Sequence, residues 1–121
     1  MLKATIGGAL VAVALIFAAG AASAAPAHKS NGVYVDSRGM TLYTYDNDST
    51  GNSNCMLGCA IAWPPFYAAS NATASGSWSL VAHGGKKMWA LRGHPLYFYV
   101  KDKKPGDKTG DGAGGVWHVA R

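Results

Sequence analysis

The chain has 121 residues, of which 49% are hydrophobic, and a formal net charge of +5 at pH 7. This length is enough for one small domain, and the mild positive charge is compatible with an anionic partner surface. It excludes the strongly basic composition of a protein dedicated to binding nucleic acid.

The N-terminal segment has the three parts of a secretory signal peptide. Lys3 is followed by an apolar stretch from residue 6 to residue 17, and small residues then end in Ala22-Ser23-Ala24. This pattern predicts cleavage after Ala24 rather than a membrane anchor, because the second half of the stretch is Ala, Gly and Ser. The mature chain, residues 25–121, is then exported to the periplasm or the medium as a soluble protein with a net charge of +4 (10 − 6).

Two segments of the mature chain repeat each other. Residues 33–67 align with residues 87–121 at an offset of 54 (87 − 33), without a gap. We therefore interpret the chain as a tandem duplication whose two copies pack together, because two units are too few for a solenoid. The identical pairs are Arg38 and Arg92, Gly39 and Gly93, Leu42 and Leu96, Tyr43 and Tyr97, Tyr45 and Tyr99, Asp48 and Asp102, and Trp63 and Trp117.

Each copy has the pattern of a β-hairpin. Runs rich in Val, Tyr and Thr flank Ser37-Arg38-Gly39 in the first copy, and similar runs flank Arg92-Gly93 in the second. Residues 78–83, which precede a turn at Gly84-Gly85, and residues 116–121 are also strand-like, whereas residues 55–63 favour about one turn of helix. The predicted fold is mainly β: a small single domain built from two tandem β-hairpin-containing repeats.

Strand alternation places the two tyrosines of each motif on one face. The opposite face is semi-polar in the first copy, with Leu42, Thr44 and Asp46, and apolar in the second, with Leu96, Phe98 and Val100. This difference predicts that the second strand is buried on both faces and the first strand on only one.

Three features together resemble a known family. They are the paired Tyr-x-Tyr-x-x-Asp motif, "CMLGCAIAWPP" after the first copy and "GDGAGGVWHV" after the second. They resemble bacterial secreted repeats that are described as predicted lipoproteins with a Tyr-x-aromatic-x-x-Asp motif and are largely uncharacterised. The chain departs from that description because it has no cysteine at the end of the signal to carry a lipid, so the resemblance does not imply membrane tethering.

The repeated motif has two interpretations. In the first, the tyrosines fill a core and each Asp closes a turn or accepts a hydrogen bond from a tyrosine hydroxyl. In the second, the same aromatic residues line a ligand cleft between the halves. The candidate site residues are Tyr43, Tyr45, Asp48, Trp63, Tyr97, Tyr99, Asp102 and Trp117.

The two cysteines also leave two interpretations open. One turn of chain between Cys55 and Cys59 brings their Cα atoms near the roughly 6 Å that a disulfide allows, and an exported protein meets an oxidising compartment. Alternatively, the thiolates bind copper together with His94 and His118, or serve a redox function. A dinuclear copper pattern would place a histidine where the chain has Trp63.

No catalytic motif is present, and the mature chain contains no glutamate. Lysines 101, 103, 104 and 108 are interrupted by Asp102 and Asp107, which indicates a solvated loop rather than a nucleic-acid surface. We therefore expect a non-catalytic binding or structural module of the cell envelope, without a cofactor, whose partners include anionic envelope components. The alternative is a periplasmic copper-handling or redox protein.

Overall fold

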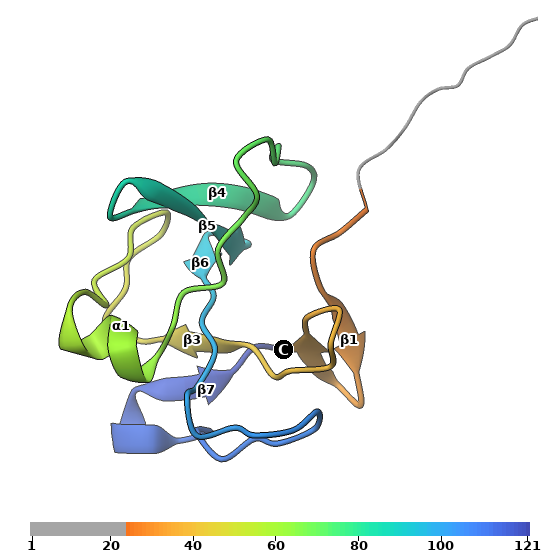
Figure 1. Cartoon of the computed structure of the whole chain (residues 1–121), viewed down its shortest axis with the longest axis vertical. Helices are drawn as coiled ribbons and strands as arrows, with labels where there is room; N and C mark the ends of the chain where they lie inside the picture. The colour runs from red at the N-terminus through yellow and green to blue at the C-terminus, as the bar shows by residue number, and fades with distance from the viewer. Residues whose placement is uncertain (1–23) are drawn as a thin grey trace, which may run out of the picture.

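The computed structural model describes residues 24–121 (Figure 1). The predicted signal peptide lies outside the described residues, apart from Ala24. Among residues 24–121, no helix has both the length and the apolar character required to cross a membrane.

The fold is mainly β, as predicted. The strands form three small antiparallel sheets, in the orders β1-β2, β3-β7 and β4-β5-β6. In Figure 1 the β4–β5 hairpin lies at the top, the β3–β7 pair lies below it, and the C-terminus lies beside β1. The elements are β1 (His28–Ser30), β2 (Val33–Val35), β3 (Tyr43–Tyr45), α1 (Gly58–Ala62), β4 (Trp78–His83), β5 (Lys86–Leu91), β6 (His94–Pro95), the 3₁₀ helix η2 (Ala113–Gly115) and β7 (Trp117–Val119).

Three tight turns set the hairpins. Asn31-Gly32, Gly84-Gly85 and Arg92-Gly93 each have two successive residues with positive φ. That backbone defines a type I′ turn, whose twist matches the twist of paired strands. The sequence analysis predicted the second and third turns. It missed strand β1, although Asn-Gly is a strong hairpin signal.

The two hairpins of the repeat differ by one residue. Val35 pairs with Thr41 across the first turn, whereas Ala90 pairs with Pro95 across the second. The offset between the copies is therefore 54 after the turns (95 − 41) but 55 before them (90 − 35). The ungapped alignment is correct for the motif strands and wrong for the strands that precede them.

The two copies complete each other's sheets. Strand β3 of the first copy pairs with β7 of the second, and the Asp46 amide donates to the Val116 carbonyl over 2.8 Å. The equivalent exchange joins the second motif strand to the first copy, where the Val100 amide donates to the Ala62 carbonyl over 3.0 Å. Because each half contributes a strand to the other, the halves form one domain.

The two motif strands meet at Tyr43 and Tyr97. Each residue donates its amide to the other's carbonyl, over 2.8 Å and 3.0 Å. Such a mutual pair is the hydrogen-bonded type of antiparallel bridge, and it places the two motifs in equivalent positions around the centre of the fold.

Burial of the two motif strands is alike, which contradicts the predicted difference. Leu42, Tyr43, Leu96 and Tyr97 are all completely buried. Val100, which was expected to be buried, is 48% exposed. Each strand is buried on both faces only where it crosses the other, and both leave the core at the same point, so position along the strand decides burial.

Candidate functional site

Each motif tyrosine at the strand crossing bonds to the aspartate of the other copy. The Tyr43 hydroxyl donates to Oδ2 of Asp102 over 2.6 Å, and the Tyr97 hydroxyl donates to Oδ2 of Asp48 over 2.7 Å. The prediction that the aspartate accepts a tyrosine hydroxyl is confirmed. The partner lies in the other repeat, so the two bonds join the halves.

The same aspartates close equivalent turns. The amides of Asp48 and Asp102 each donate to the carbonyl of the second motif tyrosine, over 3.0 Å in both copies. Oδ1 of Asp48 accepts the Asn54 amide at 2.6 Å. Oδ1 of Asp102 accepts both the amide and the hydroxyl of Thr109, at 2.9 Å and 2.6 Å. Each carboxylate therefore bonds through Oδ1 to the loop of its own copy and through Oδ2 to the buried tyrosine of the other copy.

The two pairs differ in their surroundings. Tyr43 also accepts the Gly110 amide at 3.2 Å, whereas the Tyr97 hydroxyl lies 2.6 Å from the hydroxyl of Ser53. Asp102 is buried, and the side chain of Asp48 is partly exposed. Burial raises the pKa of Asp48, against the opposing effect of its hydrogen-bond donors.

The motif glycines pack across the same interface. A Cβ atom on Gly93 would lie 2.7 Å from Cγ2 of Thr50, and one on Gly39 would lie 3.1 Å from Cβ of Pro105. Both glycines have φ of +85°, which also disfavours a side chain. The turn of each copy therefore rests on the loop that follows the motif aspartate of the other copy.

Four aromatic rings form a stack that alternates between the copies. The rings of Trp63 and Trp117 lie parallel, with centroids 3.9 Å apart. Tyr45 stacks on Trp117 at 4.2 Å, and Tyr99 stacks on Trp63 at 4.1 Å. Along the stack the rings are Tyr45, Trp117, Trp63 and Tyr99, which come in turn from the first, second, first and second copy. The stack therefore cannot form within one repeat.

The buried tyrosines make the fold sensitive to alkaline pH. Burial, reinforced by the aspartate acceptors, raises the pKa of Tyr43 and Tyr97 well above the ordinary value of 10.0. Above pH 10 the unfolded chain loses these two protons while the native chain keeps them, so the free energy of unfolding falls as pH rises. We expect a slope of about 1.4 kcal/mol per pH unit for each tyrosine, measured by urea unfolding between pH 10 and 12. Tyr97→Phe should remove about half of the slope, and an unchanged slope in that variant would contradict the assignment.

The structure places the motif tyrosines in packing contacts. Tyr43 and Tyr97 are completely buried and their hydroxyls are bonded, while Tyr45 and Tyr99 are half-buried ends of the stack. The interpretation of the motif as a core is therefore the one that the geometry supports, because no ring of the crossing pair faces solvent. A surface groove beside Tyr67 lies elsewhere, and none of these four tyrosines lines it.

Cys55 and Cys59 form a disulfide with a Cα–Cα separation of 5.2 Å, as predicted. Neither thiolate is therefore free to bind copper in this structure. His94 lies exposed on β6, and Nε2 of His118 lies 2.8 Å from Oδ2 of Asp46. Within residues 24–121, His, Cys, Asp and Glu side chains nowhere form a cluster of three that could hold a metal ion.

A buried histidine that the sequence analysis did not single out links the disulfide loop to the surface. Nε2 of His83 lies 2.7 Å from the Cys55 carbonyl, and Nδ1 lies 3.3 Å from the Tyr67 hydroxyl. Because a carbonyl only accepts, Nε2 carries the proton, and in the neutral ring Nδ1 accepts from Tyr67. His83 thereby orients the ring of Tyr67.

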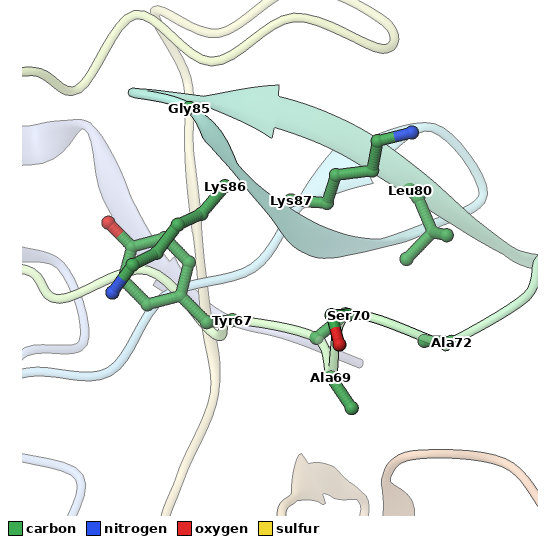
Figure 2. Close-up of a pocket in the computed structure, with 9 residues that line it drawn as sticks. Tyr67, Ala69, Ser70, Ala72, Leu80, Gly85, Lys86 and Lys87 are labelled. Carbon is green, nitrogen blue, oxygen red and sulfur yellow. The ribbon is translucent and has the colours of Figure 1, made fainter.

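Tyr67 stands at one end of a surface groove of about 530 Å³. Figure 2 shows Lys86 lying against the Tyr67 ring, and its Nζ is 4.9 Å from the ring centroid. Lys87 and Leu80 lie farther along the β4–β5 hairpin, opposite the segment that follows Tyr67 (Figure 2). The lining residues are Tyr67, Ala68, Ala69, Ser70, Ala72, Leu80, Gly85, Lys86 and Lys87.

Comparison with known proteins identifies the family. The model of a family described as a secreted repeat of unknown function matches residues 27–67 and 80–121. The chain belongs to this family. The two matched ranges contain the two predicted copies, so the secreted-repeat unit includes β1 and most of β4 as well as the motif strands. No curated protein and no solved structure matches the chain.

Proposed function

We propose that this secreted-repeat protein is an exported, non-catalytic module of the cell envelope that binds its partner through its outer surface. The observation that carries this proposal is the exchange of Tyr–Asp hydrogen bonds between the copies. It commits the reactive groups of both motifs to holding the fold together. The motif is therefore structural, and the outer surface of the hairpins and loops remains for binding.

The remaining carboxylates support a non-catalytic role. Among the described residues, Asp36 pairs with Arg38, Asp46 with His118, and Asp107 with Lys104. Oδ1 of Asp111 accepts the Val119 amide. The groove beside Tyr67 is lined by no carboxylate. An Asp or Glu acting as a general acid or base would have to lie within reach of a bound substrate, so the groove favours binding over carboxylate-dependent catalysis.

The disulfide supports export and disfavours the copper alternative. A bond between Cys55 and Cys59 forms and persists in an oxidising compartment, and it withdraws the soft ligands that Cu(I) would need. Within residues 24–121, His94 on β6 and His118 on β7 belong to no cluster of three potential metal ligands.

Fractionation of producing cells after thiol alkylation tests the location. We expect the envelope fraction to contain a chain with the mass of residues 25–121, two hydrogens lighter than the reduced form and without alkyl groups. A full-length chain in the cytoplasm, alkylated at both cysteines, would overturn the export proposal.

Incubation of the purified chain with envelope extract tests the absence of catalysis. Components that bind to the chain should be recovered chemically unchanged after prolonged incubation, as judged by mass spectrometry. A covalent change that develops with time and requires the chain would show that the module is an enzyme.

A further inference from the structure

The groove beside Tyr67 combines positive charge with a floor of short apolar side chains. Its lining contains Lys86 and Lys87 and no aspartate, and the mature chain has no glutamate. Neither lysine forms an ion pair within residues 24–121. Two cations without a neighbouring carboxylate favour an anionic ligand, because nothing in the groove neutralises them.

The rest of the lining limits what else the ligand contains. Ala68, Ala69 and Ala72 have short side chains, and Leu80 is the one large aliphatic side chain in the lining, so the groove lacks the continuous apolar wall that suits a lipid tail. Ser70 and the Tyr67 hydroxyl supply hydrogen-bonding groups along the same path. A ligand with many hydroxyl groups and a weakly apolar ring face matches this surface.

The aromatic end of the groove is held in place before a ligand arrives. The Tyr67 hydroxyl bonds to buried His83, which bonds in turn to the carbonyl of Cys55 within the disulfide loop. Lys86 lies over the same ring, at 4.9 Å from its centroid. A pre-positioned ring loses little conformational freedom on binding, which favours affinity.

We propose that this groove binds an anionic saccharide, that is, one or two sugar rings carrying a carboxylate or a phosphate. Lys86 and Lys87 are successive residues of β5, and their amino groups point to opposite sides of the hairpin (Figure 2). Each lysine therefore contacts a different polar or anionic group of the ligand, and the sugar ring lies along Tyr67 and the alanine floor. The volume of about 530 Å³ lies within the usual range of small-ligand sites. The inference deepens the proposed envelope role by naming the class of partner.

To test this proposal, the chain purified from the envelope fraction is titrated with four probes, and binding is measured from changes in its amide chemical shifts by NMR. Digalacturonate and glucose 6-phosphate represent the carboxylate and phosphate sources. Maltose is the neutral control, and a dipeptide of aspartate is the acidic control without a sugar. We expect one or both anionic sugars to shift the amides of residues 68–72 and 85–87, with the dipeptide and maltose binding at least about tenfold more weakly.

Matched variants separate the groove from general charge. Lys86→Gln and Lys87→Gln should each weaken binding about tenfold, since hydrogen bonds to charged groups are worth that order. Lys29→Gln is the control, because Lys29 also lies over a tyrosine ring, at 5.6 Å from the centroid of Tyr34, but does not line the groove. It should bind as the unmodified chain does. All three lysines are exposed, so the variants should melt alike.

Several results would overturn the proposal. They are no shift with either anionic sugar, equal binding of maltose or of the dipeptide, or an equal loss in Lys29→Gln. The titration uses purified protein, so a failure to bind these sugars would contradict the saccharide proposal without affecting the export proposal. Fractionation tests the location, and the titration tests the ligand.

Discussion

Replacing Trp63 by alanine is expected to lower the free energy of unfolding by about 4 kcal/mol, because removal of a buried tryptophan leaves a large cavity. Trp63 is 7% exposed, stacks between Trp117 and Tyr99, and meets the edge of Tyr43 at 5.3 Å. Small domains have total stabilities of about 5–15 kcal/mol, so the loss should leave the domain marginally folded. Thermal and urea unfolding monitored by circular dichroism measure it.

Trp89→Ala is the matched control for this prediction. Trp89 is only partly buried and makes one edge contact, with Trp78 at 6.2 Å, so its removal should cost about half as much or less. Trp63→Phe keeps a ring in the stack and should fall between Trp63→Ala and the unmodified protein, which keeps the test informative if the alanine variant does not fold. Equal melting of Trp63→Ala and Trp89→Ala would show that the stack does not hold the two copies together.

Asp102→Asn is expected to cost about 2 kcal/mol, the usual penalty when a buried hydrogen-bonding group loses its partner. The amide oxygen can still accept from Thr109, but the amide nitrogen then faces the Tyr43 hydroxyl and cannot accept its proton. Among the described residues the Tyr43 hydroxyl donates only to Asp102, and its other contact, the Gly110 amide, is a donor that cannot take the proton. The melting midpoint should fall by about 10 °C for a domain of this size.

Asp48→Asn is the matched variant and should cost less, about 1 kcal/mol or below. Tyr97 can turn its proton to the Ser53 hydroxyl at 2.6 Å and accept from the new amide. The substitution also removes a carboxylate whose pKa is raised by burial, which offsets part of the loss. The larger effect at Asp102 therefore follows from its partners, since the two motif strands are buried alike.

A double-mutant cycle of Tyr43→Phe with Asp102→Asn isolates this interaction. Residues in direct contact should couple by about 1 kcal/mol or more, whereas Tyr43→Phe with Asp48→Asn should be additive within about 0.5 kcal/mol. Additive losses in the first cycle would mean that the crossed bond contributes no specific stability.

Local signals in the sequence were sufficient for the elements that depend on near neighbours. Glycines that permit positive φ determined the turns at Gly84-Gly85 and Arg92-Gly93, and the apolar run between loops determined β4. The spacing of Cys55 and Cys59 determined the disulfide, because one turn of chain fixes their separation. The repeat itself showed that two equivalent units form the fold.

Only the tertiary structure decided which residues are partners. Alternation along a strand assigns a side chain to a face, but it does not say which strand lies opposite that face. The bond from Tyr43 to Asp102 and the alternating stack therefore could not be read from either copy alone. The equal burial of the motif strands has the same origin, because it is set by where the strands cross.

The candidate binding groove could not be predicted from the sequence for a related reason. Tyr67, Lys86 and Lys87 belong to no motif, and none of them was a candidate site residue. The sequence by itself determined a duplicated, disulfide-closed β domain, because turns, strands and the disulfide depend on residues close together in the chain. The tertiary structure alone decided that the motif is the interior of that domain and that the open surface lies beside it, because long-range packing brings residues 67–72 against the β4–β5 hairpin.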